Sequence, residues 1–421
     1  RFYHRVAKDP KQASARTPGR SPLTHAAPRL APSGTIPRGP GGAHDGLPED
    51  EPMTALHEAL RSLAVLDPGA VVEAIEPLAD ATGATSEKAM GYGEPMKVVL
   101  REPGGGKRTL VFHTLSRNEF GHDRRADRLD GALLAYDTFS QLPRHVRPVD
   151  VGTVTADGRL HSLREAGEAY LVTEWAEGDL YVEDLRRIAR EGEVHAQDHA
   201  RVDALARYLA QLHQGKLDDR VAWRRAVRDL VGHGEGVFGI LDAWPDDFAG
   251  VDPARLRRIE ERCLAYRWRL RPLDRRLSRT HGDFHPFNVV FLPCRPGEEH
   301  THFALLDASR GGRGDPADDV TALTVNFPFL ALASGAPGAW RALGGLWHRF
   351  WDRYLAMSND HEVLEVAPPF WAWRCLVVAT PRFYPQLPPA AREAMIRLAE
   401  AALEADRLEL DLPDRVLGSA P

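Results

Sequence analysis

The spacing of apolar residues changes character near residue 175. Before that point the chain first shows leucines at helical spacing between Leu56 and Leu66, and Asp67-Pro68 is typical of a helix start. We therefore expect two helices between residues 53 and 80. Two short β-type runs, 96–100 and 109–113, flank a glycine turn, and this arrangement predicts a β-hairpin.

The next segment, about residues 123–142, is charged and carries its apolar residues on one face, so it predicts a helix. Residues 149–154 and 169–173 are predicted as two further strands, separated by a turn at 156–158. The first part of the chain is thus expected to be small and mostly β, with one prominent helix.

After residue 178 the apolar spacing is helical almost throughout. The predicted helices span residues 181–190, 199–214, 253–271, 317–332, 339–357 and 389–408. A short β segment, 281–307, interrupts them. Strands and helices do not alternate regularly, so a doubly wound sheet is not indicated. The predicted fold class is α+β, with a small, mostly β N-terminal lobe and a larger helical C-terminal lobe.

Composition and charge narrow the class of protein. With 421 residues, 43% apolar and 27% charged, the chain has the composition of a soluble globular protein. No apolar run is long enough to span a bilayer, and we expect no membrane partner. The net charge of −6 argues against a nucleic-acid partner. The three cysteines form no CxxC pair, which is typical of a protein of the reducing cytoplasm.

Residues 1–52 differ from the rest of the chain. The first 50 residues hold eight Lys and Arg against four Asp and Glu, together with eight prolines. Such a segment cannot bury enough apolar surface to offset its ordering entropy, so we expect a disordered leader. Met53 follows an acidic run, which leaves open that the leader is not native. A transit peptide is the less favoured interpretation.

The candidate chemistry centres on His281-Gly282-Asp283-Phe284-His285-Pro286-Phe287-Asn288. Asp283 precedes Asn288 by five residues, and a β-type run follows at once. A second carboxylate, Asp307, ends the apolar run 303–306. Transfer of a phosphoryl group from a magnesium nucleotide needs one carboxylate near the acceptor hydroxyl, and an amide oxygen and a carboxylate on the metal. The alternatives are a hydrogen-bonded turn for 283–288, and a helix cap or an ion pair with Arg310 for Asp307.

Two neighbouring features allow other interpretations. His281 and His285 flank Asp283 and could belong to a metal hydrolase, but no further ligand cluster lies at a suitable spacing. We expect His281 to brace the loop. The run 315–319 is typical of a helix start whose acids serve the helix dipole. One of Asp318 and Asp319 could instead brace the loop, and we take Asp319 as the candidate.

These motifs carry a resemblance. The pattern HGDxxxxN at 281–288, Leu306-Asp307 and Asp315-Pro316-x-x-Asp319 resembles the aminoglycoside phosphotransferase and choline kinase-like family. The resemblance implies a bilobal, protein-kinase-like fold and transfer of the γ-phosphoryl group of ATP or GTP to a small-molecule hydroxyl. It implies that Asp283 is the catalytic base and that Asn288 and Asp307 are Mg²⁺ ligands.

The resemblance also implies a division into a nucleotide-binding lobe, 53–175, and a helical lobe, 176–421, that carries the catalytic loop and the acceptor site. Backbone groups of Glu174, Trp175 and Ala176 would hold the adenine.

The N-terminal lobe departs from the family pattern. The strand position where the family has a phosphate-binding lysine is occupied by His113, and Gly91 and Gly93 give only a weak glycine-loop signal. The favoured function is an ATP- or GTP-dependent small-molecule kinase. The alternative is a catalytically silent nucleotide- or metabolite-binding protein on the same fold. A protein kinase is disfavoured because no Ala-Pro-Glu element follows Asp307.

The acceptor side has one candidate stretch, residues 232–239, where four glycines alternate with polar residues that include His233 and Glu235. It could shape an acceptor pocket or simply connect two helices. The aromatic-rich runs 370–374 and 380–385 are expected to pack within the helical lobe.

Overall fold

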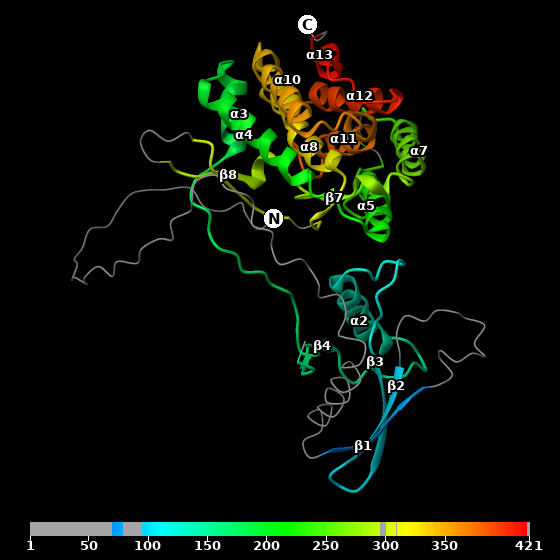
Figure 1. The fold of residues 1–421 in the computed structure, drawn as a ribbon. Helices are drawn as coiled ribbons and strands as arrows, with labels where there is room; N and C mark the ends of the chain where they lie inside the picture. The colour runs from blue at the N-terminus through cyan, green and yellow to red at the C-terminus, as the bar shows by residue number, and fades with distance from the viewer. Residues whose placement is uncertain are drawn as a thin grey trace, which may run out of the picture. The chain divides into compact units, whose positions relative to one another are not determined.

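The computed structural model describes residues 70–78, 95–155, 157–246, 248, 250–294, 300–308 and 310–418. The predictions for the leader 1–52, for a helix around Leu56–Leu66, and for Gly91 and Gly93 lie outside the described residues. Figure 1 gives the path of the chain.

The N-terminal part contains a three-stranded antiparallel sheet in the order β1-β2-β3. Its strands are β1 (Val71–Pro77), β2 (Pro95–Arg101) and β3 (Lys107–His113). Alternate residues of the central strand, Met96, Val98 and Leu100, are buried, as expected for a strand with one face covered. The predicted hairpin is confirmed, with Met96 opposite Phe112 and Leu100 opposite Arg108.

The helix predicted from Asp67-Pro68 is wrong over residues 71–77, which form β1. Three of these residues, Val71, Val72 and Ile75, are β-branched, and β1 pairs with β2 along its length. Cross-strand pairing therefore outweighs the local helix-start signal.

The predicted charged helix is confirmed as α2 (Arg125–Phe139), although none of its residues is buried. Two short strands follow, β4 (Gly152–Val154) and β5 (Leu160–Ser162), which pair antiparallel. The strand predicted at 169–173 is wrong: among the described residues this segment has no strand partner, and Tyr170 is 91% exposed. Its β-type side chains have no sheet edge to join.

The C-terminal part is helical, with short strands between the helices (Figure 1). Its helices are α3 (Tyr181–Glu191), α4 (Ala196–His213), α5 (Arg220–Gly232), α6 (Val237–Asp242), α7 (Pro253–Leu270), α8 (Pro316–Thr324), α9 (Asn326–Ser334), α10 (Ala339–Ser358), α11 (Val363–Ala379), α12 (Pro389–Glu404) and α13 (Leu412–Leu417). Its strands are β6 (Asp179–Leu180), β7 (Ser278–Arg279), β8 (Val289–Phe291), β9 (Phe303–Leu305) and β10 (Arg313–Gly314). Single 3₁₀ turns are η3 (Asp274–Arg276) and η4 (Pro286–Asn288).

Five of the six helices predicted in this part are confirmed within a few residues. The predicted helix 317–332 is instead two helices, α8 and α9, which meet at Val325. Helix α11 was not predicted. All of its residues except Glu365 and Val377 are buried, so its sequence is apolar on every side and shows no helical stripe.

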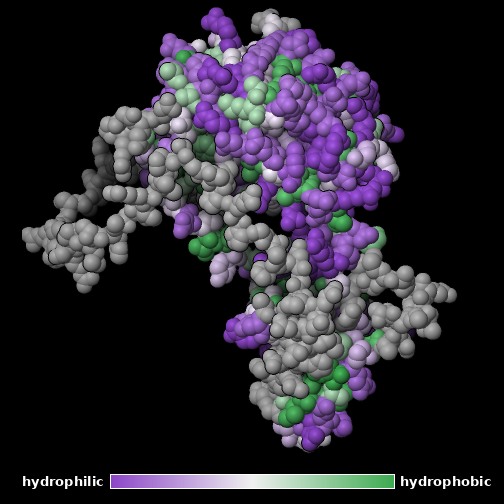
Figure 2. All heavy atoms as spheres, in the orientation of Figure 1, coloured by the Kyte–Doolittle hydropathy of each residue, from purple (hydrophilic) through white to green (hydrophobic). Residues whose placement is uncertain are grey.

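One apolar core joins α3 to α13 and includes Phe284 of the 281–288 loop. Trp223, Trp347, Trp351 and Trp371 are fully buried in it, and the visible outer face of the helical part is largely hydrophilic (Figure 2). No helix in the described ranges is both long and apolar enough to cross a membrane.

Candidate active site

The 281–288 loop connects β7 to β8 and has a defined backbone. His285 Nδ1 accepts a hydrogen bond from the backbone N–H of Phe287 at 3.2 Å, which caps the turn η4 that begins at Pro286. Gly282 has φ +84°, and a Cβ at this position would lie 2.9 Å from the carbonyl oxygen of Gly311. Only glycine fits this conformation without strain.

Asp319 holds the start of this loop from α8. One carboxylate oxygen accepts from the backbone N–H of His281 and the other from that of Gly282, both at 2.8 Å. His213 Nε2 lies 3.1 Å from the same carboxylate, and His213 Nδ1 lies 2.8 Å from the hydroxyl of Tyr354. Burial alone would raise the pKa of Asp319, but His213 and the two N–H groups hold that pKa below its usual value.

Asp283 projects from the same loop with a side chain that is 22% exposed. Its Oδ1 accepts a hydrogen bond from Arg374 Nη1 at 2.7 Å, and its Oδ2 lies 3.3 Å from His285 Nε2. Burial opposes ionisation, but the charge of Arg374 and then the contact with His285 hold the pKa of Asp283 well below its usual range. The side chain is therefore a carboxylate at neutral pH.

Arg374 comes from α11 and contacts a second carboxylate. Its Nη2 donates to Asp318 Oδ1 at 2.9 Å, and Arg310 Nη2 donates to both oxygens of Asp318 at 2.9 and 3.1 Å. The guanidinium carbons of Arg374 and Arg310 lie 4.1 and 4.3 Å from the ring centre of Trp373. Two carboxylates and two guanidinium groups thus form one compact cluster beside the loop.

Asn288 connects Asp283 to Asp307. Its side chain is buried, and its Nδ2 donates to the backbone oxygens of Asp283 at 3.1 Å and of Asp307 at 3.4 Å. In addition, the N–H of Leu306 donates to the carbonyl of Asn288 at 2.9 Å. The three residues singled out by their spacing are therefore neighbours in space.

The side-chain oxygens of Asn288 and Asp307 are suitable ligands for a magnesium ion. Both amide hydrogens of Asn288 point to protein carbonyls, and among the described residues nothing donates to its Oδ1 or to the carboxylate of Asp307. Carboxylate and amide oxygens are ligands that Mg²⁺ prefers, and it usually takes its other ligands from water and substrate phosphates. In the part of the chain that the structure describes, no cluster of three His, Cys, Asp or Glu could hold a metal alone.

The environment of Asp307 differs in two respects from the sequence-based expectation. Asp307 is exposed, so burial does not force it to take a partner, and Arg310 pairs with Asp318 rather than with Asp307. Its φ of +42° is unusual for a non-glycine residue. It is consistent with a tight turn that follows β9 and whose carbonyl, at Asp307, accepts a hydrogen bond from Asn288.

His233 and Glu235 lie beside the 281–288 loop. They form part of the wall of a cavity of about 120 Å³ that Gly282, Asp318 and Trp373 also line. The N–H of Glu235 donates to His233 Nδ1 at 3.1 Å, and Trp373 Nε1 donates to the carbonyl of Glu235 at 3.0 Å. The glycine-rich segment between α5 and α6 is therefore tied to α11.

The residues predicted to hold the nucleotide lie in other segments. His113 ends β3 opposite Pro95 and is exposed. Glu174, Trp175 and Ala176 lie in the extended segment before β6, where Trp175 Nε1 donates to Glu177. Within the described ranges, no hydrogen bond joins these four residues to the 281–288 loop.

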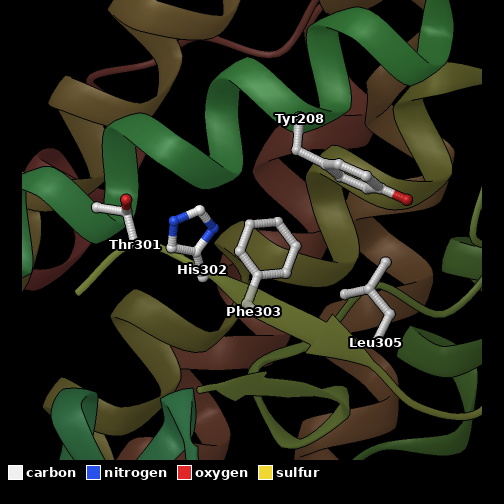
Figure 3. Close-up of a pocket in the computed structure, with 5 residues that line it drawn as sticks. All are labelled: Tyr208, Thr301, His302, Phe303 and Leu305. Atoms are coloured by element: carbon white, nitrogen blue, oxygen red, sulfur yellow. The ribbon is translucent and has the colours of Figure 1, made fainter. Parts of the chain in front are cut away.

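A larger hollow of about 440 Å³ lies beside the edge strand β9 (Figure 3). Its lining residues are Tyr208 of α4 with Thr301, His302, Phe303 and Leu305. The ring of Tyr208 stacks with Phe284 at 5.9 Å and meets Phe303 edge-on at 5.3 Å. The hollow thus borders the packing beneath the catalytic loop, and none of its lining residues is a predicted site residue.

Arg374 was missed as a site residue, Arg310 was considered only as an ion-pair partner of Asp307, and Asp318 was considered only beside Asp319. The run 370–374 was predicted to pack in the helical lobe, which holds for Trp371, but Arg374 contacts Asp283. The sequence did offer one signal, which is an arginine within an apolar run. A charged side chain in an apolar helix needs polar partners when it is buried.

Comparison with solved structures gives weak likenesses to small-molecule kinases. A glucosamine kinase matches at 15% identity over 84% of this chain and 96% of that chain, with a TM-score of 0.36. A microcompartment-associated aminopropanol kinase matches at 13% identity over 84% and 99%, with a TM-score of 0.35. An aminoglycoside phosphotransferase from Streptomyces rimosus, in complex with ADP and streptomycin, matches at 16% over 46% and 67%, with a TM-score of 0.27. Scores this low carry no conclusion about the site.

Sequence comparison is decisive for the family. No curated protein matches the chain. The model of the phosphotransferase enzyme family, however, matches residues 105–353, more than half of the chain and a range that includes the catalytic loop, Asp307 and Asp319. The predicted family and the predicted α+β, protein-kinase-like fold are both confirmed, and the chain belongs to the phosphotransferase enzyme family.

Proposed function

We propose that the chain transfers the γ-phosphoryl group of ATP or GTP to a hydroxyl group of a small molecule. The observation that carries the proposal is the contact of the Asn288 amide with the backbone at both Asp283 and Asp307. This contact supports the proposal because it joins the residues proposed as the base and as the two oxygen ligands, the groups that phosphoryl transfer requires.

Each of these residues has a proposed role. The ionised Asp283 accepts a hydrogen bond from the acceptor hydroxyl and takes its proton as the new bond to the γ-phosphorus forms and the bond to the bridging oxygen of the leaving nucleotide breaks. Asn288 Oδ1 and the Asp307 carboxylate would hold Mg²⁺. When bound, that ion neutralises charge on the β- and γ-phosphates.

Other roles concern the supporting parts of the site. Asp319 and His281 would keep the loop backbone in place, as the hydrogen bonds that Asp319 accepts from the loop N–H groups support. The wall formed by His233 and Glu235 would receive the acceptor. Family membership and the converged acidic site favour transfer over silent binding.

The nucleotide would be held by the lobe spanning 53–175. Its glycine segment at Gly91 and Gly93 and His113 would lie near the phosphates, and the backbone of Glu174 to Ala176 would hold the adenine. The lobe spanning 176–421 would supply the catalytic loop and the acceptor site. The three cysteines form no CxxC pair, which supports a cytoplasmic location.

The test is turnover against a matched mutant. Release of ADP or GDP is measured with Mg-ATP or Mg-GTP and a panel of amino sugars, amino alcohols and aminoglycosides. With the best acceptor, Asp283→Ala should lower kcat by on the order of 10²–10⁴. Asp352→Ala, at an exposed position of α10, should leave kcat unchanged. Wild-type turnover by the Asp283 variant would contradict the proposal, and nucleotide binding without turnover of any acceptor would favour the silent alternative.

A further inference from the structure

Arg374 is a charged residue in a helix that is otherwise almost entirely apolar. It is only 6% exposed, and its neighbours along α11 include the buried Trp371 and Cys375. Burying a guanidinium group costs free energy unless its hydrogen bonds and its charge are matched. The contacts that match it therefore show what holds Arg374 in place.

Those contacts are two carboxylates on different elements. Arg374 Nη1 donates to Asp283 Oδ1 at 2.7 Å, and Nη2 donates to Asp318 Oδ1 at 2.9 Å. Nη2 also lies 3.4 Å from the carbonyl of Gly282. The Nε–H is buried and has no acceptor among the described residues. The guanidinium is thus placed to bridge the catalytic loop and α8, at the expense of one unpaired donor.

The bridge is itself fixed on its far side. Arg310 occupies both oxygens of Asp318, and both guanidinium groups lie against Trp373. If the Asp283 side chain rotated, Arg374 could follow it only by breaking its own hydrogen bond to Asp318. A planar guanidinium held at two points restricts rotation more than a single ammonium would.

We propose that Arg374 is a positioning residue for phosphoryl transfer: it fixes Oδ1 of Asp283 and thereby presents Oδ2 to the acceptor hydroxyl. The inference rests on the proposed function, in which Asp283 receives the acceptor proton. It assigns to α11 a direct part in the geometry of the base. The neighbour of Oδ2, His285 at 3.3 Å, lies on the loop itself and moves with Asp283.

The experiment is a double-mutant cycle on kcat. Arg374→Lys and Arg374→Met are each made in the wild type and in Asp283→Asn, and kcat and KM are measured for nucleotide and acceptor. In the wild type, Arg374→Lys should lower kcat about tenfold and Arg374→Met about 100-fold, because misplacing the base by about 1 Å has effects of this size. The KM for nucleotide should change less than about threefold, because Arg374 contacts neither proposed metal ligand.

The second background separates positioning from general support of the fold. If Arg374 acts through the Asp283 carboxylate, Arg374→Lys should change kcat less than about twofold in Asp283→Asn. Arg374→Lys keeps the charge in the cluster, so the cycle does not depend on the methionine variant being folded. The matched control is Arg201→Met. Arg201 is equally buried and pairs with Asp184, remote in sequence from the loop, so its loss should lower the melting temperature but not kcat.

Each remaining outcome decides the matter. Equal loss of kcat from Arg374→Lys in both backgrounds, an unchanged kcat in the wild-type background, or an effect on KM alone would overturn the positioning role. Wild-type kcat in Asp283→Asn by itself would instead overturn the proposed function.

Discussion

The two regions of the molecule differ in how much of their structure is buried. Between residues 95 and 178, the buried apolar side chains among the described residues are Met96, Val98, Leu100 and Val151, and α2 has none. The helical region from 179 to 418 has a continuous core with four fully buried tryptophans. The residues proposed for the acceptor and the metal belong to the second region, and those proposed for the nucleotide belong to the first.

This contrast has a consequence for function. A side chain set in a dense core keeps its position without a ligand, because moving it would break many contacts at once. A segment with few buried contacts opens at low free-energy cost. We therefore expect the catalytic loop to be formed before substrate binds, and the nucleotide side to gain order from the nucleotide.

The largest expected effect is in the core beneath the catalytic loop. Phe284 is fully buried between the rings of Tyr208 and His281. Phe284→Ala should lower the free energy of unfolding by about 3–5 kcal/mol, the usual cost of such a cavity. Val111→Ala in β3, where the side chain is 62% exposed, should change it by less than about 0.5 kcal/mol. Urea unfolding measures both, and similar losses would remove the contrast.

The next effect concerns Asp319. Asp319→Asn removes the buried negative charge that the N–H groups of His281 and Gly282 and the ring of His213 contact. It should lower the free energy of unfolding by about 3 kcal/mol. The folded pKa of Asp319 lies below its unfolded value of about 3.9, so this stabilisation is present above that pH and is lost as pH falls further. Thermal unfolding between pH 3 and 7 should show a smaller loss on acidification in the variant than in the wild type. Parallel pH curves would contradict this role.

A smaller effect concerns the extended segment before β6. Tyr170, Leu171 and Trp175 are more than four-fifths exposed, so chymotrypsin should cut first between residues 170 and 175. If the backbone at 174–176 holds adenine, saturating Mg-ATP should slow this cut several-fold, whereas Mg²⁺ alone should not. Mass spectrometry of early fragments locates the cut. A first cut within α3–α13, or no protection by nucleotide, would count against the assignment.

Much of the helical region, and the residues that meet in its candidate site, could be predicted from the sequence. Regular apolar spacing located α4, α7, α10 and α12, because each has one face on the core and one on solvent. The offset between Asp283 and Asn288 located the loop, because a short turn running into a strand brings such groups together. These signals are local, because each is contained in one short stretch of sequence.

The rest depended on contacts between distant segments. β1 was mistaken for a helix because its identity comes from pairing with β2. Arg374 was missed because it contacts Asp283 across 91 residues of sequence. No spacing rule reports which buried charge meets which partner, so the arginine cluster could be found only in the folded chain.

The most direct test of the central claim is Mg-ATP affinity measured by calorimetry in three proteins. If Asn288 and Asp307 hold the metal while Asp283 serves only the acceptor, Asp307→Asn should weaken Mg-ATP binding by at least about tenfold. Asp283→Asn should bind Mg-ATP within about threefold of the wild type while losing turnover. Full Mg-ATP affinity in Asp307→Asn would contradict the account.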